Sequence, residues 1–198
     1  MEKDYELADF ERPALDLSKP VLLPGKAGMG KTQYAMAHGK YPLRIKTLDD
    51  LKKIVDGTTD LLVFDDMVFG PGTKENPGND LPDNTMLALL DFEQETSIGK
   101  DKDRTYVRND TGKIPKRMKR IFLTNIRCDG SEKLKDMNGR TLHPFPYGGT
   151  AQIQAALDRR YRLEPYVEEP LFSVTKAVVR RLVKQVISNV KRDLCPVV

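Results

Sequence analysis

Short runs of apolar residues, each ending in glycine or polar residues, recur along the chain and predict buried strands. Three such runs span 21–23, 61–64 and 121–123, and a further short strand is expected over 161–163. Apolar residues at helical spacing predict helices over 31–38, 48–55, 83–92, 152–158 and 174–190. Runs that are apolar at every position suit strands covered on both faces. Their alternation with helices predicts an α/β fold, with a mostly parallel central sheet flanked by helices.

The less patterned stretches divide the chain into three parts. Residues 1–19 are acidic and are expected to form a lead-in, 20–172 hold one domain, and 173–198 form a basic amphipathic C-terminal helix. Within the domain, 70–83 is rich in glycine, proline, asparagine and aspartate, and this composition predicts an irregular surface loop.

Composition narrows the class of protein. A chain of 198 residues with 39% hydrophobic and 31% charged residues suits one globular domain. The longest apolar runs are far too short to span a membrane, and the acidic N-terminus does not resemble a secretory signal. These features predict an intracellular protein without a membrane partner. Cys128 and Cys195 lack the spacing of a metal site and are expected to be free thiols. The net charge of +4 is small, so basic residues matter through their local clusters.

The first apolar run leads directly into a complete GxxxxGKS/T motif. Its residues are Gly25, Lys26, Ala27, Gly28, Met29, Gly30, Lys31 and Thr32. Glycines permit a tight loop whose backbone N–H groups point at phosphate oxygens. Lys31 is expected to reach the β- and γ-phosphates of ATP, and the Thr32 hydroxyl to bind Mg²⁺. A glycine-rich turn without a ligand is the alternative, but the strand and helix on either side favour a nucleotide site.

Polar side chains follow the other two long apolar runs. The run over 61–64 ends in Asp65, expected to hold Mg²⁺, and Asp66, expected to polarise the attacking water. The run over 121–123 leads to Asn125, which is expected to contact the γ-phosphate and this water, because ligands bind at the carboxyl ends of parallel strands. A cap or turn formed by these polar residues is the alternative.

The order of these elements carries a resemblance to a known family. The matching segments are 25–32, 63–66, 112–115, 120–125 and 170–172. Together they resemble the superfamily 3 helicases, a branch of the AAA+ ATPases. More narrowly, they resemble the helicase domain of replication initiator (Rep) proteins of small circular single-stranded DNA viruses and related plasmids. The resemblance covers about 20–172 and implies an AAA+ P-loop core.

A basic segment precedes the third apolar run. Residues 109–112 form a turn-rich interruption between 104–107 and 116–120, which favours a β-hairpin. The resemblance implies that this hairpin grips single-stranded DNA in a central channel. The matching basic positions are Arg108, Lys113, Lys116 and Arg117. Contacts between such residues and phosphates give affinity without sequence reading. A solvated basic hairpin is the alternative.

The resemblance also implies a site shared between subunits of a ring, with six as the expected number. Arg160 is the preferred arginine finger that enters the neighbouring ATP site, and Arg159 is the second choice. Asn125 matches the sensor of the γ-phosphate. A surface arginine pair is the alternative to the finger. The C-terminal helix is expected to dock on the core with its basic side in solvent, with a subunit or nucleic-acid contact as the alternative.

The expected function is that of an ATP-dependent DNA helicase domain. Two rivals stay open: a picornavirus-type ATPase of RNA replication, and a non-motor P-loop switch or scaffold. Rep proteins carry a nicking domain with a metal-binding His pair and a catalytic Tyr, which 1–19 do not supply. The full-length protein is expected either to hold this domain elsewhere or to have lost nicking. The expected location is the host nucleus if the source is a eukaryotic DNA virus.

Overall fold

The computed structural model describes residues 5–67, 69, 83–97, 99–101, 104–106, 113–127 and 151–194. Most of the expected loop over 70–83, the basic residue Arg108 and both cysteines lie outside the described residues.

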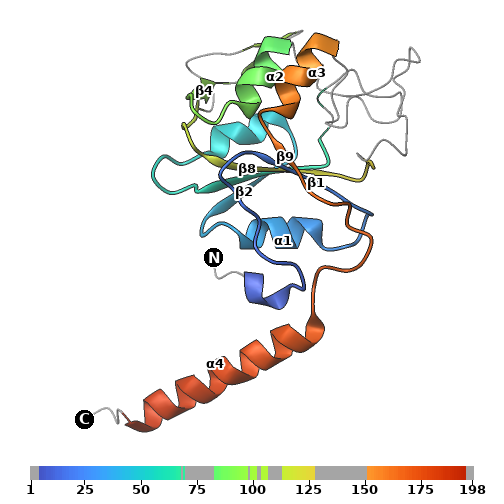
Figure 1. The fold of residues 1–198 in the computed structure, drawn as a ribbon. Helices are drawn as coiled ribbons and strands as arrows, with labels where there is room; N and C mark the ends of the chain where they lie inside the picture. Colours follow the sequence, from blue (N-terminus) through green and yellow to red (C-terminus); the bar gives the residue numbers. More distant parts are fainter. Residues whose placement is uncertain are drawn as a thin grey trace.

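A five-stranded parallel sheet forms the centre of the fold (Figure 1). Its strands are β1 (Val21–Pro24), β2 (Pro42–Ile45), β3 (Leu61–Asp65), β8 (Lys119–Thr124) and β9 (Arg162–Leu163), in the order β2-β3-β8-β1-β9. Every neighbouring pair runs parallel. The prediction of an α/β fold with a parallel sheet is therefore confirmed, although β2 carries too weak an apolar pattern to have been predicted.

Helices cover both faces of the sheet, which explains why its central strands are apolar throughout (Figure 1). On one face lies α1 (Lys31–Ala37), whose Tyr34 and Ala35 are buried against β1, β3 and β8. The other face is covered by η2 (Leu48–Lys53), α2 (Asp83–Leu90) and α3 (Ala151–Asp158). All four match helices predicted from the apolar spacing. One of them, η2, is a 3₁₀ helix.

The sheet order places the ends of three strands together. Strand β8 follows β3 in sequence but lies between β3 and β1, pairing with both. Parallel strands share one edge for their carboxyl ends, so the residues that follow β1, β3 and β8 meet at that edge. This insertion brings positions from three distant parts of the chain into one site.

The lead-in packs on the domain rather than extending from it. Its 3₁₀ helix η1 (Leu7–Asp9) is followed by Phe10, which is 3% exposed and forms an antiparallel β-bridge with Phe172. The backbone amide of Glu11 donates to the Leu171 carbonyl at 2.9 Å. The lead-in and the C-terminal end of the domain therefore lie side by side.

The basic segment pairs differently from the predicted hairpin. Strand β6 (Arg104–Tyr106) pairs with β5 (Gly99–Asp101), and β7 (Lys113–Ile114) pairs with β4 (Thr96–Ser97). The predicted pairing of 104–107 with 116–120 is wrong, because Lys119 and Arg120 belong to β8. The fully buried Arg120 side chain donates to the carbonyls of Leu89 and Asp91 at the end of α2, which fixes this stretch beneath the helix.

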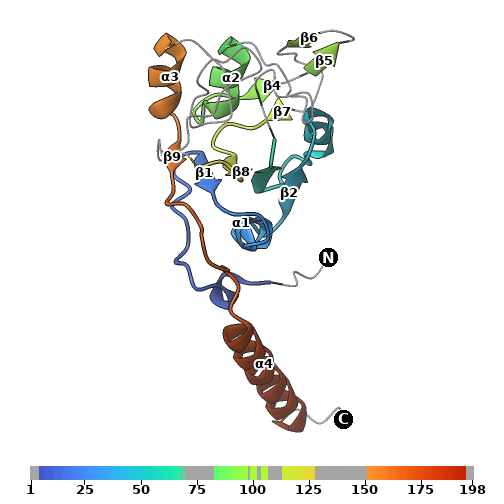
Figure 2. The ribbon, with the colours of Figure 1, turned by 90° about the vertical axis from the view of Figure 1, so that its right-hand side faces the viewer.

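The last helix, α4 (Val174–Leu194), projects away from the domain (Figures 1 and 2). Its contacts with η1 use a polar side, where Arg180 binds Asp9 and Lys184 binds Glu6. The apolar side is exposed by 48–66% at Val174, Val178, Val179, Leu182, Val183, Val186, Ile187 and Val190. The predicted docking of the apolar side on the core is therefore wrong. Within the described parts of the chain, no helix is long and apolar enough to cross a membrane.

Candidate functional site

The glycine-rich loop begins where β1 ends, and its glycines are required by its geometry. A Cβ atom on Gly25 would lie 2.5 Å from Cβ of Val167 and 2.8 Å from the Val167 carbonyl oxygen. Gly28 and Gly30 have φ angles of 79° and 80°, in the left-handed region that favours glycine. The loop therefore reverses tightly between β1 and α1, and 166–172 passes directly against it.

Lys31, at the start of α1, is held by three hydrogen bonds. Its ammonium group donates to the carbonyl oxygens of Gly25 at 2.7 Å and Lys26 at 2.8 Å, and to Oδ1 of Asn125 at 2.8 Å. Burial lowers the pKa of Lys31, while Asp66 and Asp65 act in the opposite direction. The side chain thus fixes a positive charge beside the loop and the two carboxylates.

Thr32 and Asp65 form an oxygen pair suited to Mg²⁺. The Thr32 hydroxyl donates to Oδ1 of Asp65 at 3.0 Å. Arg44, from β2, donates from Nε to the other oxygen of Asp65 at 2.6 Å and turns Oδ1 toward Thr32. The described residues contain no group of three or more His, Cys, Asp or Glu side chains that could hold a metal. The pair still fits Mg²⁺, which commonly takes one or two protein oxygens and completes its shell with phosphate and water.

Asp66 and Asn125 complete the polar end of the site. Nδ2 of Asn125 donates to Oδ2 of Asp66 at 3.1 Å, so the Asn125 amide bridges Asp66 and Lys31. Asp66 has a φ of 52°, an unusual value for a non-glycine residue. Burial raises the pKa of Asp66, with Asp65 adding to this effect and Lys31 opposing it. A carboxylate with a raised pKa is a better proton acceptor.

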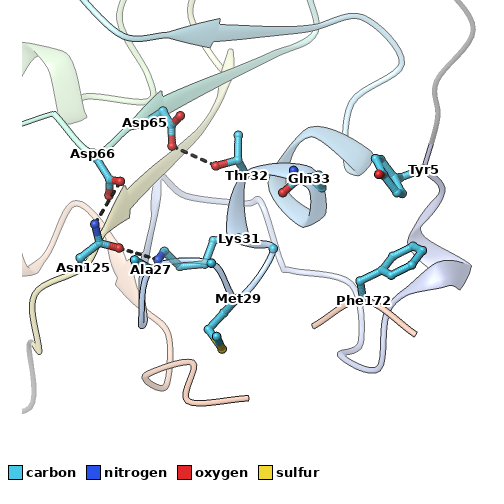
Figure 3. Close-up of a pocket in the computed structure, with 12 residues that line it drawn as sticks. Tyr5, Ala27, Met29, Lys31, Thr32, Gln33, Asp65, Asp66, Asn125 and Phe172 are labelled. Carbon is cyan, nitrogen blue, oxygen red and sulfur yellow. Dashed lines mark hydrogen bonds between the residues drawn. The ribbon is translucent and has the colours of Figure 1, made fainter. Parts of the chain in front are cut away.

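These residues line a single pocket of about 420 Å³ (Figure 3). The polar end holds the predicted phosphate and metal residues. Three further lining residues were not predicted as ligands: Tyr5, Gln33 and Phe172. Arg44 was also missed, because nothing in the local pattern of β2 indicates that it lies beside β3. The complete lining is Tyr5, Ala27, Gly28, Met29, Gly30, Lys31, Thr32, Gln33, Asp65, Asp66, Asn125 and Phe172.

The two candidate arginine fingers lie away from this pocket. They precede β9, whose first residue pairs with the first residue of β1. Both therefore lie at the amino ends of the strands, opposite the glycine-rich loop. Arg159 donates to the Ala155 carbonyl at 3.2 Å and Arg160 to the Ala156 carbonyl at 2.9 Å. Arg160 also lines a second hollow of about 310 Å³ beside α2.

Two of the predicted nucleic-acid residues, Lys116 and Arg117, have described side chains, and neither lines the pocket. Arg108 lies outside the described residues, and Lys113 is placed only by its backbone in β7. Lys116 is exposed, and Arg117 forms an exposed ion pair with Glu93 at 3.2 Å. The structure therefore places Lys116 and Arg117 on an accessible surface.

The chain was compared with protein-family models, with curated proteins and with solved structures. None of the three comparisons found a match.

Proposed function

We propose that this protein binds ATP with Mg²⁺ and hydrolyses it to ADP and phosphate. The observation that carries the proposal is the convergence of Lys31, Thr32, Asp65, Asp66 and Asn125 at one end of one pocket. These residues come from three segments that are far apart in sequence, each at or just beyond the carboxyl end of a parallel strand. A structural role for each separately would not require them to meet.

The geometry supports a role for each of these residues. Lys31 neutralises charge on the β- and γ-phosphates, and Thr32 and Asp65 hold Mg²⁺, which when bound offsets the charge of the phosphate oxygens. Asp66 accepts a proton from a water molecule as its oxygen attacks the γ-phosphorus. The bond to the β–γ bridging oxygen breaks, and ADP leaves with that electron pair. Asn125, bonded to both Lys31 and Asp66, holds the acceptor in line.

Position favours Arg160 as a residue that serves a neighbouring molecule. It lies at the amino ends of the strands, whereas its own pocket lies at the carboxyl ends. A head-to-tail contact between copies brings these two edges together, and repetition of such a contact gives a ring where the rotation between copies closes. We propose a ring, with six subunits as the expected number, in which Arg160 completes the adjacent site. Arg159 is the second candidate.

The proposed work of the ring is movement along single-stranded DNA, as in a replication helicase. Support comes from the exposed basic surface at Lys116 and from the resemblance in motif order. Steady-state ATPase activity, measured over a range of protein concentrations with and without single-stranded DNA, tests the proposal. We expect the ATPase activity per subunit to rise with protein concentration and to rise when single-stranded DNA is added. Stimulation by RNA alone favours the RNA-replication ATPase, and slow hydrolysis without stimulation favours the switch.

Two variants test the shared site directly. Arg160→Ala and Asp66→Ala proteins are each expected to be inactive, because one lacks the finger and the other lacks the proton acceptor. A mixture of the two forms some interfaces with an intact Arg160 facing an intact Asp66, so activity returns. Additive activity of the two variants, with no gain on mixing, contradicts the shared site. The Lys31→Ala variant tests the pocket itself, and we expect this variant to lose ATP binding.

A further inference from the structure

The end of the pocket opposite the catalytic residues is aromatic. Tyr5 and Phe172 lie side by side there, with ring centroids 5.2 Å apart and planes at 85° (Figure 3). Both rings are half-buried, unlike Phe10 behind them, which is 3% exposed. Each ring therefore keeps surface that is available to a ligand in the pocket.

Backbone hydrogen bonds hold this aromatic end against the glycine-rich loop. The Leu171 amide donates to the Met29 carbonyl at 3.0 Å, and the Lys26 amide donates to the Val167 carbonyl at 2.9 Å. On the other side, the Ser173 amide donates to the Asp9 carbonyl at 2.7 Å. The position of Phe172 is thus fixed relative to the phosphate end of the same pocket.

The two ends differ in chemistry. The charged lining residues Lys31, Asp65 and Asp66 gather at the phosphate end, whereas Met29 and exposed Gln33 lie between that end and the two rings (Figure 3). A flat uncharged ring such as a nucleobase stacks well on aromatic side chains, and this stacking depends little on which base it is. The Gln33 amide offers a donor and an acceptor for the edge of such a ring.

We propose that Tyr5 and Phe172 form the nucleobase-binding end of the pocket, with Met29 and Gln33 beside them. This inference rests on the proposed function, because the triphosphate must occupy the glycine-rich loop for the base to reach the rings. The lead-in is then part of the nucleotide site, since it supplies Tyr5.

Comparison of ATP with inorganic tripolyphosphate separates the two ends. Binding of each, with Mg²⁺, is measured by calorimetry for wild type, Phe172→Ala, Phe172→Leu and the control Tyr41→Ala, whose ring is 51% exposed elsewhere. We expect Phe172→Ala to weaken ATP binding by about 5- to 100-fold and to leave tripolyphosphate binding unchanged. Phe172→Leu keeps apolar bulk without an aromatic face and is expected to lose most of the same affinity.

The outcomes distinguish the two proposals. Wild-type protein that binds neither ligand overturns the proposed function, and this inference with it. Wild-type protein that binds both, with Phe172→Ala unchanged toward ATP, overturns only the nucleobase assignment. Equal loss of ATP and tripolyphosphate binding also overturns it, because the effect then does not depend on the base.

A reporter variant covers the case in which Phe172→Ala does not fold. The chain contains no tryptophan, so Tyr5→Trp places a single indole at the aromatic end. Stacking of a base on this ring is expected to quench its emission when ATP is added. Tripolyphosphate is expected to leave the emission unchanged. An identical response to both ligands, or no response to ATP at saturation, contradicts the assignment.

A second inference rests on α4, independently of the nucleotide site. Its eight exposed apolar side chains lie on one side of the helix, and the polar side is already bound to η1. Half the surface of a helical cylinder about 31 Å long and about 10 Å wide is on the order of 500 Å². Two such faces, fully covered, bury about 1,000 Å², which reaches the lower limit for a specific interface.

We infer that α4 pairs with α4 of a second copy of this chain, through its apolar side. Positions Val179, Val183, Val186 and Val190 follow the alternating spacing of four and three residues that forms the seam between paired helices. This contact needs no nucleotide and adds to any contact made at the ATP site.

Sedimentation equilibrium without nucleotide tests the pairing. Val183→Glu combined with Val186→Glu places charges in the seam and is expected to weaken self-association by about 100-fold or more. The control is Val55→Glu, which makes the same change at a position that is 56% exposed away from α4. A wild-type protein that stays monomeric at high concentration, or a double variant that associates like wild type, overturns the pairing.

Discussion

Nζ of Lys31 lies 2.8 Å from Oδ1 of Asn125, although the two residues are 94 positions apart in sequence. The other end of the Asn125 amide donates to Asp66. One neutral side chain therefore orients both the proposed phosphate-binding cation and the proposed proton acceptor.

Removal of this amide is expected to impair turnover more than binding. Asn125→Ala frees Lys31 and Asp66 from their common partner, so we expect kcat to fall by about 100- to 1,000-fold. The Kd for ATP is expected to change little, because Lys31 keeps its charge. Single-turnover kinetics and calorimetry measure the two quantities separately. An equal loss in kcat and in affinity would indicate that Asn125 serves only to hold the pocket together.

Asp66→Asn is expected to stabilise the protein while abolishing most of its activity. Burial raises the pKa of Asp66, so its charged form costs stability at neutral pH. The asparagine keeps the shape without the charge, and we expect a gain of about 1 kcal/mol in the absence of nucleotide and Mg²⁺. Loss of the proton acceptor is expected to reduce kcat by about 100- to 10,000-fold.

The stability difference between Asp66→Asn and the wild-type protein is expected to depend on pH. As pH falls through the raised pKa of the folded protein, wild-type Asp66 takes up a proton and its penalty disappears. The stability advantage of Asp66→Asn is therefore present at neutral pH and is lost below the ordinary value of 3.8. Urea unfolding at several pH values measures the difference. An advantage that persists at low pH would contradict this cause.

Asp9 and Arg180 join the lead-in to α4 by a two-pronged ion pair, at 2.6 and 2.5 Å. Asp9 is fully buried, so Arg180→Met removes the ion-pair partner of its carboxylate, and we expect a loss of about 3 kcal/mol. Adding Asp9→Asn is expected to recover part of this loss, because asparagine is uncharged and still accepts the Glu6 amide. Urea unfolding of the single and double variants checks this order.

The same pair has a defined pH window. Burial by itself raises the pKa of Asp9, but Arg180 and the Glu6 amide outweigh it and bring the value below 3.8. The stability contributed by Asp9 is therefore complete above 3.8 and is lost as pH falls through the lowered pKa. The cost of Arg180→Met is expected to shrink over that range, and an unchanged cost would contradict an ionic origin.

Two glycines in the loop are expected to tolerate alanine differently. Gly25→Ala places a Cβ atom 2.5 Å from Val167, so the two segments must separate, at a cost of about 3 kcal/mol. Gly28→Ala meets open space and costs only the strain of its positive φ, about 1 kcal/mol. Thermal unfolding of both variants provides the comparison. A larger loss for Gly28→Ala would contradict this assignment of causes.

Local patterns in the sequence determined the strands β1, β3 and β8, because strands covered on both faces must be apolar at nearly every position. They also determined the glycine-rich loop, since Gly28 and Gly30 adopt backbone angles that other residues resist. The polar residues at the ends of β3 and β8 were also recognisable, because they follow apolar runs.

Tertiary structure alone decided which of these residues meet. The insertion of β8 between β1 and β3 brings Asn125 to Lys31, and the pairing of β2 with β3 brings Arg44 to Asp65. The contact of Tyr5 with Phe172 likewise joins the lead-in to the C-terminal end of the domain. None of these contacts can be predicted from the local periodicity of the sequence, because strand order and long-range packing depend on the free energy of the whole fold. The same holds for α4, whose amphipathic pattern specifies an apolar side but not what that side faces.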